Sequence, residues 1–177
     1  MRKLTTLTLC LLFAAVAFAE EAKKEVKKPL SPPAKAEATI GGKHITIDYS
    51  APSKRNRVIM GELVPYGKVW RTGANAATTL TTDGELMIGK LHLAPGTYTL
   101  YTIPGEKEWT LIVNKQTGQW GTNYDEAQDL GRVPMKVTAV KDTVETFAIA
   151  LEPGKANRGT LTLTWENTQA SVPVMVH

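Results

Sequence analysis

The stretch TLTLTW, residues 160–165, decides the fold, because apolar Leu161, Leu163 and Trp165 alternate strictly with threonines. Side chains of a β-strand point alternately to its two faces, so this pattern predicts a strand with one buried and one solvated face. The same alternation appears before it, over residues 147–151, and after it, over residues 172–176. We therefore expect three successive strands at the C-terminal end, joined by turns at residues 152–157 and 167–168.

The period of two continues upstream of this stretch. Two alternating segments, residues 36–40 and 44–49, flank Gly41-Gly42, which is typical of a short hairpin. Sustained helical periodicity is missing after residue 35, and a single helical turn is expected, within residues 123–130. The fold class is therefore all-β, an antiparallel β-sandwich of roughly ten short strands with long irregular loops. The further expected strands cover residues 69–71, 77–82, 85–88, 97–103, 109–114 and 133–140.

The N-terminus has the pattern of a secretory signal peptide. Arg2 and Lys3 precede an apolar run over residues 7–18, and Ala17 and Ala19 are small enough for cleavage near Ala19. The apolar run is too short to span a bilayer as a helix, so we expect no transmembrane segment in the mature chain. The sequence thus predicts a signal peptide over residues 1–19 and an exported protein, either periplasmic or secreted.

The rest of the chain is expected to hold a tether and one domain. Residues 20–35 are rich in Lys and Pro and bury little, which predicts a disordered tether. Residues 36–177 then form a single β-sandwich domain. Cys10 is the only cysteine and lies in the predicted signal peptide, so the mature chain would have neither a disulfide nor a thiol nucleophile.

The charge distribution argues against nucleic acid as a partner. The formal net charge is +4, yet beyond residue 35 the Lys and Arg residues equal the Asp and Glu residues in number. Because a nucleic-acid binder usually presents a basic domain, we expect no nucleic-acid binding.

One segment, here called the cationic loop (residues 54–75), breaks the β pattern and concentrates positive charge. Arg side chains match anionic groups, and loops on a rigid scaffold often carry binding residues. In the functional interpretation three arginines hold an anion while Tyr66 or Trp70 offers an aromatic face. In the alternative, Arg71 pairs with a carboxylate, apolar loop residues plug one end of the sandwich, and Asn75 caps a turn. The expected site residues are Arg55, Arg57, Tyr66, Trp70, Arg71, Asn75 and, from a second loop, Trp120.

The second loop, residues 114–129, carries Trp120 near two glycines and then Tyr124. Aromatic rings on loops can stack on sugars, which makes a glycan a second ligand class. The alternative is that Trp120 folds back over the core. The acidic side chains of this loop could collect calcium but match no calcium motif, so solvated acids are the favoured interpretation. Trp109 and Trp165 lie in alternating strands and are expected in the core.

Catalytic signatures are weak, and we predict no catalytic residue, metal site or cofactor. His44 and Asp48 lie four residues apart on one face of an expected strand, which would suit an acid–base or metal pair, although cross-strand contacts explain them as well. The remaining histidines, His92 and His177, do not complete a three-histidine zinc site of usual spacing. Sequence signatures of serine hydrolases, phosphate loops, dinucleotide folds and zinc proteases are absent.

Five motifs resemble those of a known family. They are ITIDYSAP (45–52), GELVPYGKVWRTGAN (61–75), LAPGTY (93–98), IPGEKEW (103–109) and QWG (119–121). On these motifs the chain resembles the exported bacterial proteins grouped as domain of unknown function 2911, over about residues 36–176. The resemblance implies a secreted or periplasmic β-rich domain and supplies no reaction, ligand or catalytic residue.

Three functional hypotheses remain open at this point. The first is a non-catalytic envelope domain that binds an anionic or glycan ligand through the cationic loop. The second is a hydrolase or isomerase that uses His44, Asp48 and a nearby arginine on a small envelope substrate. The third is a structural or partner-binding envelope protein. The sequence does not determine the oligomeric state.

Overall fold

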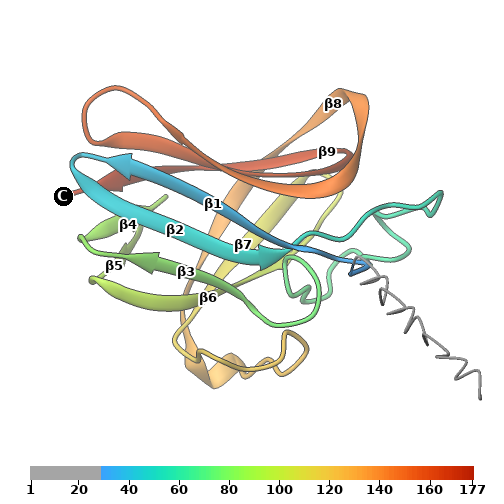
Figure 1. Cartoon of the computed structure of the whole chain (residues 1–177), viewed down its shortest axis with the longest axis horizontal. Coiled ribbons are helices and arrows are strands. Elements are labelled where there is room, and N and C mark those ends of the chain that lie inside the picture. The colour runs from blue at the N-terminus through green and yellow to red at the C-terminus, as the bar shows by residue number, and fades with distance from the viewer. Residues whose placement is uncertain (1–28) are drawn as a thin grey trace, which may run out of the picture.

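The computed structural model describes residues 29–177, which form nine β-strands and one short 3₁₀ helix (Figure 1). The all-β, antiparallel class predicted from the sequence is confirmed. The predicted helical turn is confirmed as η1. The predicted signal peptide and the first part of the predicted tether lie outside the described residues. The strands are β1 (Pro33–Ile40), β2 (Lys43–Ser50), β3 (Thr78–Thr82), β4 (Leu86–Ile88), β5 (Leu91–Leu93), β6 (Gly96–Ile103), β7 (Glu108–Asn114), β8 (Asp129–Pro153) and β9 (Arg158–Val176), with η1 at Glu126–Gln128.

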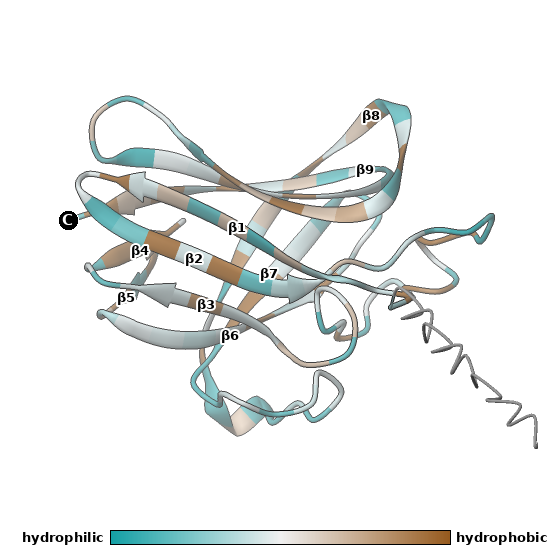
Figure 2. Ribbon diagram, viewed as in Figure 1, coloured by the Kyte–Doolittle hydropathy of each residue, from teal (hydrophilic) through white to brown (hydrophobic). Residues whose placement is uncertain are grey.

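The β1–β2 hairpin follows directly from its sequence. Gly41 and Gly42 form the two-residue turn with φ of 57° and 77°, a region that glycine enters without a Cβ penalty. The turn sets the register, in which Ile40 opposes Lys43. Along β1 and β2 apolar and polar residues alternate, and Figure 2 shows this as alternating brown and pale bands on β2. Since β1 begins at Pro33, the last residues of the tether predicted over 20–35 belong to the domain.

The strands form one antiparallel sheet in the order β1-β2-β3-β6-β7-β8-β9-β4-β5. The sheet folds over, so β1 lies against β8 and β9 without being a ladder neighbour of either (Figure 1). The chain just after β2 is also bonded to β8, because Phe147 N donates to Pro52 O at 2.9 Å and Lys54 N donates to Glu145 O at 2.7 Å. The two layers of the sandwich are thus parts of one continuous sheet.

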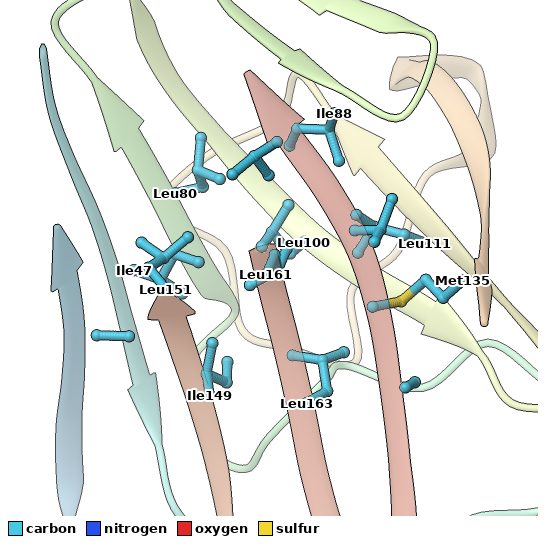
Figure 3. Packing of buried hydrophobic residues seen from close by; sticks show 14 of the residues in the cluster. Ile47, Leu80, Ile88, Leu100, Leu111, Met135, Ile149, Leu151, Leu161 and Leu163 are labelled. Carbon is cyan, nitrogen blue, oxygen red and sulfur yellow. The ribbon is translucent and has the colours of Figure 1, made fainter. Parts of the chain in front are cut away.

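The core lies between these layers. Side chains from β2, β3, β6 and β7 meet those from β8 and β9, as the labelled residues of Figure 3 show. Burying each such aliphatic side chain contributes about 1.5–3 kcal/mol, so this interface dominates the stabilisation of the fold. Trp109 and Trp165 are 1% and 2% exposed, which confirms their predicted place in the core.

The nine strands agree with the predicted number of roughly ten, but β8 and β9 are long rather than short and some predicted bounds are wrong. The turn predicted at residues 167–168 does not exist, because β9 runs without interruption from Arg158 to Val176. Instead, β9 bends at Glu166, whose φ is 55°, opposite a part of β8 where the register shifts on both sides of Val144. The strand predicted at residues 69–71 is only a single bridge between Trp70 and Thr102, and the short strand β5 was not predicted.

Across residues 29–177, no helix has the length and apolar character needed to cross a membrane.

Candidate functional site

A pocket of about 660 Å³ lies beside the cationic loop, at the end of the sheet from which this loop projects (Figure 1). Its walls come from the segment before β1, the cationic loop, β6, the β7–β8 loop and β9. Three arginines are its only charged lining residues within the described chain. The residues that line it are Leu30, Ser31, Pro52, Ser53, Arg55, Arg57, Leu63, Val64, Val69, Trp70, Arg71, Gly73, Ala74, Tyr101, Gly121, Thr122, Tyr124 and Trp165.

The cationic loop is anchored to the sandwich through Glu166, at the bend of β9. One oxygen of this carboxylate lies 3.3 Å from the Lys54 ammonium, and the other accepts from the backbone N–H groups of Ile59 and Met60, each at 3.3 Å. Ile59 and Val64 are 0% and 2% exposed and belong to the core cluster. Ile59 and Val64 therefore fill one end of the sandwich, as the alternative interpretation expected of the apolar loop residues. Their burial also holds in place the loop that forms one wall of the pocket.

A tight turn presents the first two arginines. Arg55 and Asn56 have φ of 50° and 60°, the left-handed region that non-glycine residues seldom occupy. Arg55 N donates to a Glu145 carboxylate oxygen at 2.8 Å, which holds this turn against β8. Arg57 donates from Nε to Lys54 O at 2.9 Å, so its guanidinium is fixed by the backbone of its own loop.

The three guanidinium groups bind backbone carbonyls rather than carboxylates. Arg55 Nη2 donates to Leu30 O, Arg57 Nη2 donates to Ser53 O at 2.7 Å, and Arg71 Nε approaches Gly73 O at 3.4 Å. Among residues 29–177 none of the three forms an ion pair. The pairing of Arg71 with a carboxylate, expected in the alternative interpretation, is not found there. Guanidinium N–H donors without an anionic partner therefore gather at this pocket.

Arg71 lies against the second loop at a point where only glycine leaves room. A Cβ added to Gly121 would come within 2.7 Å of Arg71 Cδ and 2.8 Å of Asn75 O. Backbone bonds join the loops here, because Gly121 N donates to Asn75 O at 3.0 Å and Ala77 N donates to Gln119 O at 3.2 Å. The motifs GAN (73–75) and QWG (119–121) are thus in contact, and this contact holds the part of the pocket wall that contains Arg71.

Trp70 connects the pocket with the core. Its ring is stacked on Trp165 with centroids 5.8 Å apart and meets Trp109 and Phe147 edge-on at 6.2 and 5.0 Å. Aromatic pairs in such geometries contribute about 0.5–1.5 kcal/mol beyond their burial. Trp70 therefore forms a half-buried aromatic wall of the pocket, held rigidly by the core.

Two tyrosines, one from β6 and one from the β7–β8 loop, also line the pocket. Tyr101 and Tyr124 meet edge-on with centroids 4.9 Å apart, and Tyr124 donates to Asp129 Oδ2 at 2.7 Å. Burial, together with this hydrogen bond, raises the pKa of Tyr124 to about 12. Burial also raises the pKa of Tyr101. Both phenols are therefore neutral at physiological pH and add no negative charge to the pocket.

Asp129 is neutralised by Arg132, outside the pocket lining. Arg132 donates to Asp129 Oδ2 from Nε at 3.0 Å and from Nη2 at 2.9 Å, and to Glu126 at 2.6 Å. The hydrogen bond with Asp129 raises the pKa of Arg132. Asp125 caps η1 by accepting from Ala127 N at 3.0 Å. The acids of the second loop thus serve structural contacts.

The structure brings together four of the seven predicted site residues, namely Arg55, Arg57, Trp70 and Arg71. The other three, Tyr66, Asn75 and Trp120, do not line the pocket. Asn75 Nδ2 lies 3.4 Å from Ser31 O, and Tyr66 packs over Gly61 with its ring 40% exposed. Trp120 is 53% exposed next to the lining residue Gly121, so it does not cover the core as the alternative interpretation proposed. Sequence reasoning missed Tyr101 and Trp165 as pocket residues and named Tyr124 only as an aromatic residue of the second loop.

The candidate acid–base pair lies elsewhere. His44 and Asp48 are exposed on β2, neither lines the pocket, and Asp48 lies 3.4 Å from the Lys35 ammonium. Within the described residues no three His, Cys, Asp or Glu side chains gather closely enough to hold a metal ion.

Comparisons with known proteins give one match. A family model described as "Protein of unknown function (DUF2911)" matches residues 31–174, nearly all of the described chain. No curated protein and no solved structure matches the chain.

Proposed function

This chain belongs to the DUF2911 family, whose description assigns no activity, and from that premise we propose that the pocket beside the cationic loop binds a small organic anion. The observation that carries the proposal is the charge of the pocket. Among the described residues that line it, three are arginines and none is Asp or Glu. Guanidinium groups match carboxylate, phosphate and sulfate geometry and bind them through charge-assisted hydrogen bonds. The proposal includes the export that the N-terminal sequence predicts and a non-catalytic role in the envelope.

The walls of the pocket favour an anion with an apolar or aromatic body. Leu63, Val69 and the stacked Trp70 line it together with the arginines. Pockets of this kind combine an apolar lining with a few polar groups that fix the orientation of the ligand. An inorganic anion would contact the arginines and leave the apolar wall uncovered.

The proposal is tested by thermal unfolding with a panel of probes. We would use phenyl phosphate, benzoate, glucuronate, glucose 6-phosphate, inorganic phosphate and soluble cell-wall fragments. A ligand at one hundred times its dissociation constant stabilises by about 2.7 kcal/mol, which raises Tm by roughly 5–10 °C for a domain of this size. We expect such a shift with at least one organic anion, and calorimetric titration would then give its affinity.

Two matched arginine variants locate the binding. Arg71→Gln should weaken binding at least tenfold, because it removes a charge from the pocket lining. Arg158→Gln is the control, since Arg158 is exposed and lies outside the lining. The proposal fails if no probe shifts Tm, or if both variants bind as the wild type does.

A glycan held at the pocket rim is a second candidate, and the exposed ring of Trp120 favours it. An exposed indole beside a pocket is a suitable stacking surface for a sugar. Trp120→Ala should then abolish the shift caused by cell-wall fragments while leaving the shift caused by phenyl phosphate unchanged. Loss of both shifts, or of neither, would contradict a separate glycan site.

A further inference from the structure

A second group of chemically distinctive side chains lies at the other end of the sheet, beside the C-terminus (Figure 1). Met87, in the middle of β4, pairs on one side with Met175 of β9 and on the other side with His92 of β5. Residues that oppose each other in an antiparallel ladder point to the same face of the sheet. Three side chains with metal-binding atoms therefore lie side by side across three adjacent strands.

The burial of neighbouring residues shows on which face of the sheet Met87, Met175 and His92 lie. The neighbours of Met87 along β4, Leu86 and Ile88, are 1% and 0% exposed and belong to the core. Since strand residues alternate between faces, Met87 lies on the outer face, and so does Met175, which stands between two buried valines. This outer group is accessible to solvent, because Met87 and Met175 are half-buried and His92 is exposed.

A fourth side chain joins the group. His177 follows Met175 by two residues, and its ring lies near that of His92, with centroids 5.6 Å apart and planes 25° apart. The two rings are stacked, and within residues 29–177 neither imidazole takes part in an ion pair. Metal–nitrogen bonds of about 2 Å, together with the radii of the two rings, allow centroids up to roughly 6 Å apart on one ion.

The methionine side chains can reach an ion held between the rings. Cβ atoms of directly opposed residues are about 4.5–5.5 Å apart, and the unbranched thioether side chain adjusts its length and direction easily. We propose that Met87, His92, Met175 and His177 form a binding site for Cu(I).

The ligand atoms select the metal. Thioether sulfur is a soft ligand that favours Cu(I), whereas Zn²⁺ sites are built from thiolate, imidazole and carboxylate. No carboxylate completes such a set here, because the described residues hold no cluster of three His, Cys, Asp or Glu side chains. Two imidazoles and two thioethers therefore make a site for Cu(I) rather than for zinc.

The site is tested by anaerobic Cu(I) titration of the full chain against a chromophoric Cu(I) chelator. Every sample carries Cys10→Ser, because a free thiol would bind Cu(I) itself. We expect one equivalent of Cu(I) to be withdrawn from the chelator. Met87→Leu and Met175→Leu nearly conserve volume and should keep the fold while lowering the affinity at least tenfold. Met60→Leu, in the cationic loop, is the matched control and should bind as the parent does.

A second measurement does not depend on variants. On addition of Cu(I), the ε-methyl carbon resonances of Met87 and Met175 should shift while those of Met60 and Met135 stay in place. The inference is overturned if no Cu(I) is withdrawn, or if His92→Asn removes binding while both methionine variants leave it intact. The last result would show a site made of imidazole alone. Binding that is equal for Zn²⁺ and Cu(I) would overturn the assignment of the metal.

Discussion

Tyr124 illustrates, at the scale of a single residue, how the pocket avoids negative charge. Burial and the hydrogen bond to Asp129 raise the pKa of Tyr124 to about 12, from an ordinary value of about 10. Since the folded state holds the phenol proton more tightly than the unfolded state, the stabilisation is complete below about pH 10. It is lost as the pH rises towards about 12.

We predict that the free energy of unfolding falls more steeply between about pH 10 and pH 11 in the wild type than in Tyr124→Phe. The ring is partly exposed, so solvent screening keeps the difference below about 1 kcal/mol. Urea unfolding at a series of pH values measures it, and ultraviolet phenolate absorbance follows the ionisation itself. Parallel pH profiles of the two proteins would contradict the prediction.

The sequence allowed us to predict those pocket residues that lie close together in one segment of the chain. Arg55, Arg57, Trp70 and Arg71 belong to one segment whose local charge and irregular pattern mark it as a loop with a function. Tyr101 reaches the pocket from β6, where residues 99–102 are all buried and nothing in the local pattern distinguishes it from core. Its contribution depends on which strands become neighbours, a property that local patterns do not contain.

At the scale of elements, the Glu166 carboxylate at the bend of β9 is one of the anchors of the cationic loop. The Lys54–Glu166 pair has an N–O distance of 3.3 Å and side chains that are 20% and 18% exposed. The Lys35–Asp48 pair has nearly the same distance, 3.4 Å, but side chains that are 52% and 56% exposed. The two pairs therefore differ mainly in their access to water.

Double-mutant cycles on the two pairs should give different coupling energies. We expect about 1–2 kcal/mol for Lys54→Met with Glu166→Gln, because partial burial reduces screening. For Lys35→Met with Asp48→Asn we expect about 0.5 kcal/mol or less. Urea unfolding of the single and double variants measures both values. Equal couplings would show that Glu166 holds the loop through its bonds to the backbone alone.

The long strands show where a local pattern misleads. Asn and Thr at 167–168 are common turn residues, and the alternation on either side made them look like a connection between strands. In the structure, pairing with β8 carries β9 through this point, and the change of direction is absorbed by the positive φ of Glu166 and the shifted register near Val144. Bulges and bends of this kind depend on the partner strand, so they leave little trace in one segment of sequence.

At the scale of the molecule, the two proposed sites lie at opposite ends of one folded sheet (Figure 1). The arginine pocket is formed where irregular loops meet, whereas the methionine and histidine group lies on regular strands near the C-terminus. Among residues 29–177, the end of β9 is the one sheet neighbour of the β4–β5 hairpin that carries this second group. The second site therefore exists only once β4 has paired with the C-terminal part of β9, which is distant from it in sequence.

This topology makes a prediction about folding. The β1–β2 hairpin pairs residues that are adjacent in sequence, but β4 pairs residues 86–88 with residues 174–176. Pairing of strands that are distant in sequence costs loop-closure entropy before the new contacts stabilise the chain. Sandwiches of this kind therefore fold in milliseconds to seconds. Ile47 in β2 and Ile88 in β4 are both fully buried, which makes Ile47→Val and Ile88→Val a matched pair.

Each substitution should cost about 0.5–1.5 kcal/mol, but the two should act on different rates. We expect Ile47→Val to slow folding, because the local hairpin forms early. Ile88→Val should mainly speed unfolding, because the β4–β9 contact forms late. Stopped-flow chevrons of both variants measure this division. Folding in microseconds would contradict the argument from topology. A slower folding rate for Ile88→Val than for Ile47→Val would show that β4 pairs with β9 before the local hairpin forms.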